Sequence, residues 1–295
     1  INKRIKKNIR RVRKDKDTLQ HKQLSDITTF GYKLLNSIGE APVVVDSNEV
    51  YQTIKQLNLY LIRKGFFNNI VTDSIHYLDK GFLGIKRKRA EVYYKINTKA
   101  PYKVKIFTIE CKDTAVFKIV KSINKNTKIK QGDIFDIDKI DEERNRITSK
   151  LLNLGYYRFN KNYIDFYIDS TVGKNEVVIK MNIALANKKS NVKDSVSNVN
   201  HEQFYIKRVQ INYTQDESST NRLSFNFKDV DFNIHGKNDV RASLFYKALK
   251  LKPGDLYNKE KEEQMFRQYT SLGIFKTINI KTQLDSAGTN NLQLI

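Results

Sequence analysis

Four acidic side chains are the first candidates for chemistry, because they fall within a short stretch of the chain. They are Asp138, Asp141, Glu142 and Glu143. Neighbouring carboxylates can act as general acid and general base. The same acids are also typical of the first turn of a helix, where the helix dipole stabilises negative charge. Since no nucleophile or base accompanies them in the sequence, we expect a helix start and no enzyme.

Metal and cofactor chemistry has no recognisable pattern here. The four histidines are far apart and show no metal-ligand spacing: His21, His76, His201 and His235. The single cysteine, Cys111, follows Phe107 and Ile109 at alternate positions, which favours a small buried side chain over a nucleophile. The glycines form no phosphate-binding motif. We therefore expect no cofactor and no metal.

The chain is strongly basic, with 54 Lys and Arg against 32 Asp and Glu and a formal net charge of +22. The excess is concentrated in residues 1–22 and in the run Lys86, Arg87, Lys88 and Arg89. Such clusters can bind nucleic-acid phosphates or anionic lipid headgroups, and solvated charge is the common alternative. Aromatic pairs after the predicted helices could stack on bases, but their fixed position favours a place in the core. We rank a membrane surface above nucleic acid.

Length and composition allow several packed domains. The 295 residues are 39% hydrophobic and 11% aromatic, which is enough to build cores. No apolar run approaches the roughly 20 residues of a membrane span. Residues 291–295 have the pattern of a strand that opens with nothing after it. We therefore expect a fragment of a longer protein.

One layout occurs three times: a helix, a glycine, two large apolar residues and an alternating strand. The glycines are Gly65, Gly155 and Gly273, and strands are predicted after them at 70–79, 163–170 and 277–285. Glycine suits a helix end because it takes a positive φ without steric cost. We expect the apolar pair after each glycine to fold back beneath its own helix.

The three helices show apolar residues at spacings of three and four, which predicts one buried face. These residues are Val50, Ile54, Leu57 and Leu61, then Ile140, Ile147, Leu151 and Leu154, then Met265, Tyr269 and Leu272. Asp46, Asp138 and Asn258 are the predicted capping residues at the helix starts.

A second shared element precedes the second and third helices. Residues 130–136 and 252–258 are the same turn, built around Gly132 and Gly254, and each turn follows a strand and a short helix. The predicted repeat is β-α-turn-α-β-β, with both helices on one face of a three-stranded mixed sheet. The fold class is therefore α+β, in tandem modules.

These repeats divide the chain into five segments. They are a basic segment at 1–23, modules at 24–100 and 101–186, a polar connector at 187–202, and a module at 203–295. The first module shows no recognisable first strand; its first helix is predicted at 24–38 and its turn at 39–45. In that module Lys86–Arg89 is expected to be a loop between two paired strands. The connector is expected to be flexible, and the last module carries a polar insertion at about 214–238.

The layout resembles the POTRA domain of the BamA/TamA superfamily of outer-membrane assembly factors. Three segments are closest to TamA-like lipoproteins (TamL): Gly39-Glu-Ala-Pro-Val-Val-Val-Asp46, Asp141-Glu-Glu-Arg-Asn-Arg-Ile147 and Asn153-Leu-Gly-Tyr-Tyr-Arg-Phe159. The resemblance implies a periplasmic array attached to the outer membrane through a barrel and a lipid anchor, which binds client polypeptides and other assembly subunits without covalent chemistry. A BamA-type core insertase is the alternative within the superfamily.

A sheet of this kind leaves edge strands to which an extended client can add. The candidate edges are the strands directly after each helix. The side chains expected there are Ile75 and Tyr77, then Tyr163, Asp165 and Tyr167, then Ile278 and Ile280. The groove between each edge and its helix is expected to hold alternate side chains of the client.

Overall fold

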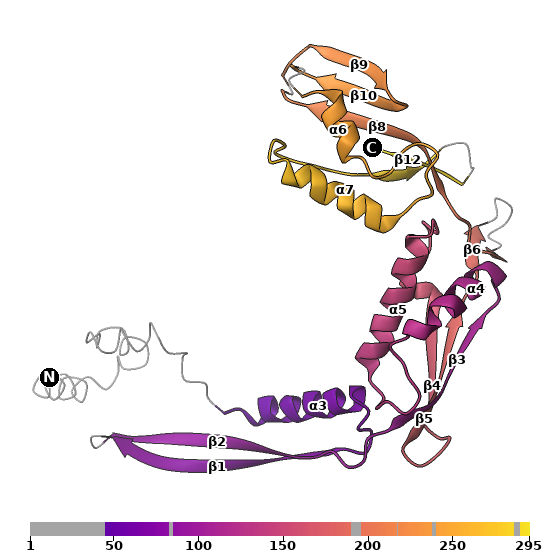
Figure 1. Ribbon diagram of the computed structural model, residues 1–295. Coiled ribbons are helices and arrows are strands. Elements are labelled where there is room, and N and C mark those ends of the chain that lie inside the picture. The colour runs from indigo at the N-terminus through magenta and orange to yellow at the C-terminus, as the bar shows by residue number, and fades with distance from the viewer. Residues whose placement is uncertain (1–44, 83–84, 190–195, 217, 238–239, 286–289) are drawn as a thin grey trace, which may run out of the picture. The chain divides into compact units, whose positions relative to one another are not determined.

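The computed structural model describes residues 45–82, 85–189, 196–216, 218–237, 240–285 and 290–295 (Figure 1). The predicted basic segment at 1–23, the helix at 24–38 and nearly all of the turn at 39–45 lie outside these ranges. The chain divides into two compact units. Among the described residues, one unit holds 45–54 and 73–93, and the other holds 55–72 and 94–295.

The first repeat consists of a helix and a hairpin in the described part of the chain. Helix α3 (Ser47–Arg63) follows Asp46, whose carboxylate accepts a hydrogen bond of 2.9 Å from the Asn48 amide, as predicted for a cap. Strands β1 (Ile70–Phe82) and β2 (Ile85–Asn97) form a two-stranded sheet. The three-stranded sheet predicted for every module is therefore not present here among the described strands.

The basic run lies inside β2, so its prediction as a loop is wrong. Residues Lys86, Arg87, Lys88 and Arg89 continue the strand almost from its first residue.

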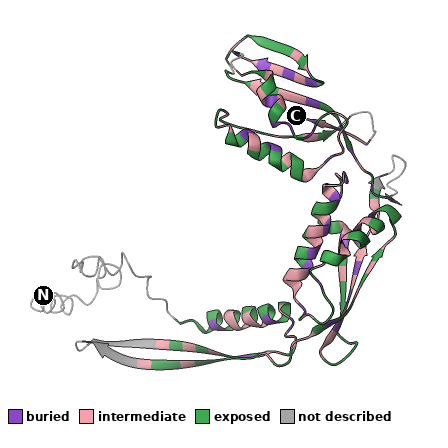
Figure 2. Ribbon diagram, viewed as in Figure 1, coloured by how far each residue is buried: buried purple, intermediate pink, exposed green. Residues whose placement is uncertain are grey.

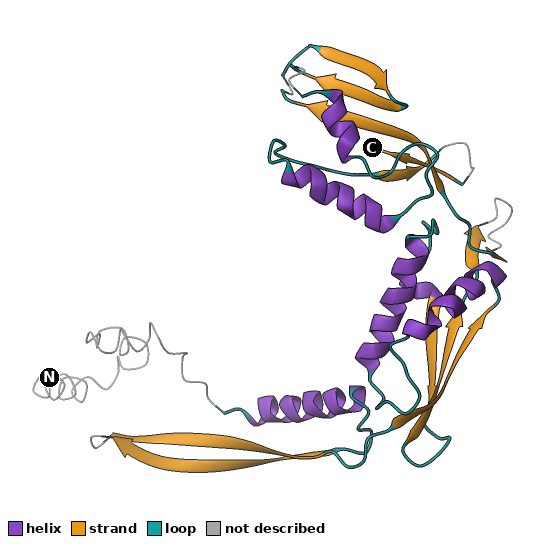
Figure 3. Cartoon of the chain, viewed as in Figure 1, coloured by secondary structure: helices purple, strands orange, loops and turns teal. Residues whose placement is uncertain are grey.

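The second repeat forms a complete two-layer domain, called here the three-stranded module. Its strands are β3 (Lys103–Cys111), β4 (Ile164–Asp169) and β5 (Glu176–Ile183), in the order β3-β5-β4. β5 is parallel to β3 and antiparallel to β4, so the sheet is mixed as predicted. Helices α4 (Thr114–Ile123) and α5 (Ile137–Leu152) cover one face (Figure 3).

The predicted helix face is the core of this module. Ile140, Ile147 and Leu151 are buried, and the two last of these pack in a cluster with Met181 and Ile183 of β5. Alternate residues of β5 are buried along its whole length (Figure 2). The residues that the helical and the strand periodicity mark as buried therefore pack together in one core.

Helix α5 begins earlier than predicted. The capping side chain is Asp136, which accepts a hydrogen bond of 2.9 Å from the Asp138 amide. The turn before α5 ends at Asp136. The Asp136 carboxylate, and not that of Asp138, therefore lies next to the free amides of the first helical turn. Asp138 instead faces outward and binds Arg63 and Lys64.

The third repeat contains a larger sheet than predicted and is called here the five-stranded module. Its elements are β8 (Tyr205–Thr214), β9 (Arg222–Phe227), β10 (Val230–His235), α6 (Ala242–Ala248), α7 (Lys259–Ser271), β11 (Thr282–Leu284) and β12 (Asn291–Leu294). The strand order is β11-β12-β8-β10-β9. The predicted insertion at 214–238 therefore supplies two extra strands, β9 and β10, on the far side of β8.

The insertion joins the sheet because its apolar residues alternate. Val230, Phe232 and Ile234 are buried on one face of β10, and the ring of Phe225 stacks on Phe232 at 5.2 Å. The insertion is polar in composition because the outward half of each of its strands is polar. On the other side of the sheet β11 is only three residues long, so residues 277–280 of the strand predicted at 277–285 lie outside it.

The connector is more ordered than predicted. Strands β6 (Ala186–Lys189) and β7 (Val196–Val199) pair antiparallel. Beyond them, the His201 amide donates to the buried Asp113 carboxylate at 2.7 Å. The other oxygen of Asp113 caps α4 through two amides. One buried acid therefore holds the connector to the start of a helix.

Each of the first two repeat glycines joins its helix to the next module in the same way. The Tyr102 amide donates to Gly65 O at 2.8 Å, and the Phe204 amide donates to Gly155 O at 2.8 Å. The second aromatic residue after each glycine packs forward: Phe67 on Tyr102 at 4.7 Å, and Tyr157 on Phe204 at 5.8 Å. The prediction that both residues of the pair fold beneath their own helix is wrong for these two. Tyr156 alone does so, within the core of the three-stranded module.

Candidate functional site

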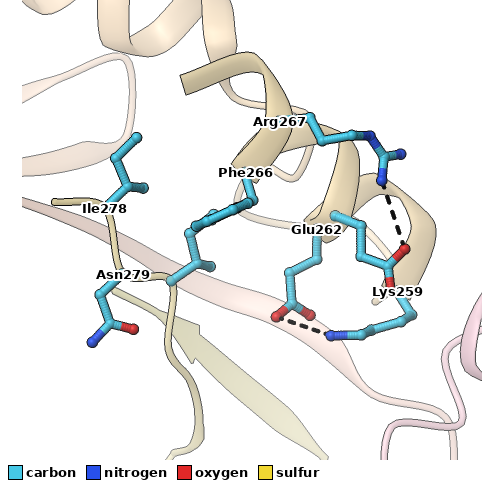
Figure 4. Close-up of a pocket in the computed structure, with 8 residues that line it drawn as sticks. Lys259, Glu262, Phe266, Arg267, Ile278 and Asn279 are labelled. Atoms are coloured by element: carbon cyan, nitrogen blue, oxygen red, sulfur yellow. Dashed lines mark ion pairs between the residues drawn. The ribbon is translucent and has the colours of Figure 1, made fainter. Parts of the chain in front are cut away.

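The best-formed candidate site is a groove between α7 and the chain that leads into β11 (Figure 4). Asn258 caps α7, and Met265 and Tyr269 turn one helix face into the core. The next face presents Phe266 to the groove, whose volume is about 300 Å³. Ile278, Asn279 and Ile280 form the opposite wall. The structure thus brings together two of the predicted residues, Ile278 and Ile280.

The backbone of this opposite wall is available for pairing. Among the described residues, Ile278, Asn279 and Ile280 form no backbone hydrogen bond with a neighbouring strand. Pairing begins at Lys281, which exchanges two bonds of 2.8 Å with Ile295. Exposed backbone amides and carbonyls in an extended segment can template another strand. Phe266, with 45% of its surface exposed, lies ready to cover one incoming apolar side chain.

The charges at the groove are balanced, although the whole chain is basic. Lys259 pairs with Glu262 at 3.6 Å, and Arg267 pairs with Glu263 at 3.9 Å. Such exposed pairs contribute little stability. Glu262 also accepts a hydrogen bond of 2.7 Å from the Tyr257 hydroxyl. Burial, and then this bond, raises the pKa of Tyr257 far above its usual value, so the phenol stays neutral.

The predicted residues of β4 lie at a second edge. Asp165 and Tyr167 are exposed on the face away from the helices, and Tyr163 precedes the strand. The Tyr163 ring packs on His201 at 4.8 Å, so it is already engaged. Arg144 of α5 donates to Ile164 O at 3.1 Å and lies over the Phe166 ring. One backbone acceptor of this strand is therefore already occupied.

The remaining predicted residues are not gathered at either edge. Ile75 and Tyr77 lie in the hairpin strand β1, where Tyr77 is 78% exposed. For Lys86, Arg87, Lys88 and Arg89 the structure places the backbone in β2. The predicted residues thus belong to three separate parts of the chain: the β1–β2 hairpin, β4 and the segment before β11.

The five turn glycines, Gly65, Gly132, Gly155, Gly254 and Gly273, all have a φ between 67° and 91°. At Gly65 a Cβ atom would lie 2.5 Å from the Phe135 carbonyl oxygen, and at Gly155 it would lie 2.6 Å from Leu256. The positive φ and the close approach both favour glycine at these two joints.

The sequence did not predict the structural roles of three residues. Phe266 follows the buried Met265, so a large apolar residue just off the buried helix face was the available signal. No signal in the sequence linked Arg144 to β4. Glu143 was predicted only to lie at a helix start; it is fully buried and binds Arg146 at 2.6 Å and the Lys128 amide at 3.0 Å. Only tertiary structure shows these partners.

Within the residues that the structure describes, no group of three or more His, Cys, Asp and Glu side chains could hold a metal ion. The Cys111 thiol donates to Asp113 O at 3.3 Å, and burial raises its pKa. That shift makes the thiol a poorer nucleophile at neutral pH. Among the described helices, none combines the length and the apolarity that a membrane crossing requires.

Solved structures that align with the chain include parts of BamA and Omp85 proteins. POTRA domains 3–5 of BamA from Haemophilus influenzae align with a TM-score of 0.44 and 10% identity, over 92% of this chain and 91% of that one. The N-terminal domain of Omp85 from Thermosynechococcus elongatus aligns with a TM-score of 0.27 and 11% identity, over 90% of each chain. BamA from Haemophilus ducreyi, lacking POTRA domains 1–3, aligns with a TM-score of 0.44 and 10% identity, over 65% of this chain and 28% of that one.

Sequence comparison places two parts of the chain in a family. None of the curated proteins matches the chain in sequence. The family model for POTRA, the surface antigen variable number repeat, matches residues 120–184 and 225–294. These segments contain α5, β4 and β5 of the three-stranded module and β10, α6, α7, β11 and β12 of the five-stranded module. These two segments of the chain therefore match POTRA domains.

Proposed function

We propose that this chain is a periplasmic POTRA array of an outer-membrane protein assembly factor, and that it binds extended polypeptides by adding them as strands to its sheets. Two POTRA matches support the family, and the structures that align with the chain come from BamA and Omp85 proteins. The array positions clients and other assembly subunits and performs no covalent chemistry. A TamL-like lipoprotein is our first choice and a BamA-type core insertase the second.

The groove beside β11 carries this proposal. An extended backbone at Ile278–Ile280 has no strand partner among the described residues, and Phe266 borders it from α7. Strand addition uses main-chain hydrogen bonds for affinity and side-chain pockets for selectivity. Because every polypeptide has the same backbone, this binding mode accepts varied client sequences.

The organisation of the chain supports a scaffolding role. We propose module boundaries at 24–100, 101–186 and 203–295, with the connector at 187–202 tied to the second module through His201 and Asp113. The basic run Lys86, Arg87, Lys88 and Arg89 is proposed to contact anionic headgroups of the outer membrane rather than nucleic acid.

A peptide titration tests the groove. The probe is a blocked nine-residue peptide that alternates threonine and valine, and the readout is the backbone amide shift of the ¹⁵N-labelled chain. We expect saturable shifts at residues 278–284. Phe266→Ala should weaken this binding about tenfold, because one buried aromatic contact contributes roughly 1.5–3 kcal/mol.

The matched control is Ile274→Ala. Ile274 is 53% exposed and lies outside the groove, so its removal should leave the peptide affinity unchanged. Equal losses in the two variants, or the absence of shifts at 278–284 at millimolar peptide, would refute the proposal.

A further inference from the structure

The outer face of the five-stranded sheet carries a ladder of side-chain hydrogen bonds. Four strands contribute uncharged groups to it: Ser224 of β9, Asn233 of β10, Asn212 and Gln210 of β8, and Gln293 of β12. The bonds are 2.8 Å from Ser224 to Asn233, 3.0 Å from Asn233 to Asn212, 2.8 Å from Gln210 to Asn212, and 3.2 Å from Gln293 to Gln210. Ladders of this kind extend readily when another strand is added.

The ladder reaches the edge of the sheet at β9. This strand pairs with β10 alone among the described strands. The Ser224 hydroxyl donates to Asn233, and its lone pairs remain able to accept a bond from a side chain across the edge. Asn226, two residues on, lies on the same face and binds Asp231 at 3.0 Å.

The hairpin register exposes the backbone of these same residues. The β9–β10 turn has two residues, Lys228 and Asp229, with φ values of 53° and 62°. In such a hairpin the flanking residues, Phe227 and Val230, exchange both backbone bonds, and bonded and non-bonded pairs alternate from there. Ser224 and Asn226 therefore fall in non-bonded pairs. Their N–H and C=O groups point away from β10, toward the open edge.

The edges of the three-stranded module show features that oppose further pairing, whereas β9 carries a charge only at its first residue, Arg222. Along β3, the turn at Ile134 bridges the first residues, and the register with β5 shifts after Val104. Along β4, Arg144 occupies a carbonyl and Asp165 adds charge. Charges, bulges and covered ends are the usual protections of an edge strand. Residues 223–227 of β9 contain neither a charge nor a proline.

The inner side of this edge is apolar and partly open. Leu223 is 44% exposed, and Phe225 and Phe227 pack only partly against the core. Tyr246 of α6 contacts the Phe227 ring at 5.9 Å and extends the apolar surface. An added strand would cover these side chains with its own inward residues.

We propose that β9 is a strand-addition site distinct from the β11 groove, and that its ligand is an uncharged amphipathic strand. Outward Thr, Ser, Asn or Gln side chains of that strand continue the ladder beyond Ser224. Inward aliphatic residues cover Leu223 and Phe225. A lysine at an outward position would lose the ladder bond and would face Arg222, which lies on the same side of β9 as Ser224, so the site selects against it.

The test uses the whole chain and the threonine–valine peptide described above. We expect saturable amide shifts at 222–227 in addition to those at 278–284. Ser224→Pro removes an amide that points outward and leaves the pairing with β10 in place. This variant should weaken binding at β9 at least tenfold. A lysine at every outward position of the peptide should weaken it similarly.

The two sites are read independently in one titration. Gln283→Lys is the matched control, because it places a charge at the opposite edge of the same sheet and should not affect binding at β9. The proposal is overturned if 222–227 show no shifts, or if Ser224→Pro leaves them unchanged. Shifts at β9 with none at 278–284 would support this inference while refuting the groove, and the reverse result would do the opposite.

Discussion

The three-stranded and five-stranded modules have the same core and different edges. In both, a first strand is held at its start by a Gly-Asp turn: the Val104 amide donates to Asp133 O, and the Ile206 amide donates to Asp255 O, each at 2.8 Å. Beyond that point β3 has an open side, whereas β8 is paired with β10 along Val209–Thr214. The insertion therefore moves the open edge outward from β8 to β9.

This difference shows which parts of the chain are constrained by folding and which are available for binding. The buried stripes of α5 and α7 and the central strands are similar in the two modules. The outer faces differ: β3 and β5 carry ion pairs such as Lys105–Glu176 and Lys180–Glu110, whereas the five-stranded sheet carries the amide ladder beside a single longer pair, Arg208–Asp231 at 3.5 Å. Edges and outer faces are free to diverge because they do not determine the core.

The largest expected effect distinguishes the glycines at the two joints, Gly65 and Gly155, from the glycines in the turns, Gly132 and Gly254. Gly65→Ala should destabilise the chain by about 3 kcal/mol, because the new Cβ meets a backbone oxygen that cannot move independently. Gly155→Ala should cost about 2 kcal/mol, because the Leu256 side chain can rotate away.

The matched controls are Gly132→Ala and Gly254→Ala, which have a similar φ but open space around the new Cβ. Each should cost only about 1 kcal/mol, the strain of a left-handed alanine. Denaturant unfolding measures how much each of the four variants is destabilised, and amide exchange at Tyr102 and Phe204 reports on the two joints. Equal costs at all four glycines would show that the close contacts do not matter.

A smaller effect concerns the edge at β4. Arg144→Met keeps the apolar stem over Phe166 and removes the donor to Ile164 O. We expect the threonine–valine peptide to produce new amide shifts at 164–169, with binding about threefold stronger there than in the parent chain. If the peptide shifts none of the amides at 164–169 in this variant, Arg144 does not limit pairing at that edge.

The smallest expected effect is a difference in how the stability of the two joints depends on pH. Hydrogen bonds from Lys64 and Arg63 hold the pKa of Asp138 below its usual value, while the equivalent joint relies on Asn153, Asn258 and Glu260. A depressed folded pKa gives stabilisation that is complete above the unfolded value, about 3.9, and is lost as the pH falls through the folded value.

Acidification below about pH 4 should therefore lower the protection of the Tyr102 amide, relative to its intrinsic exchange rate at each pH, more than that of the Phe204 amide. Asp138→Asn should remove most of the difference between the two amides. If the Tyr102 amide of the parent chain shows no acid dependence of its own, the ion pairs do not contribute to the first joint.

The periodicity of the sequence predicted the helices and central strands of both complete modules because burial requires it. Ile147, Leu151 and Met265 lie in the core at the predicted positions. The pairing of the insertion with β8 was not predicted, because half of its residues face solvent. The groove contains Ile278 and Ile280, which the sequence proposed as edge residues, and Phe266, which it did not propose, since only the fold brings α7 beside them.

Amide hydrogen exchange of the unmodified chain, with and without the threonine–valine peptide, tests the central claim most directly. Strand addition in the groove predicts that at saturation the amides of residues 278–280 exchange at least tenfold more slowly, because their exposed N–H groups acquire main-chain partners. The amides of β4 should change little, because Arg144 occupies one of its carbonyls. Peptide binding that protects β4 and leaves residues 278–280 unchanged would contradict the account.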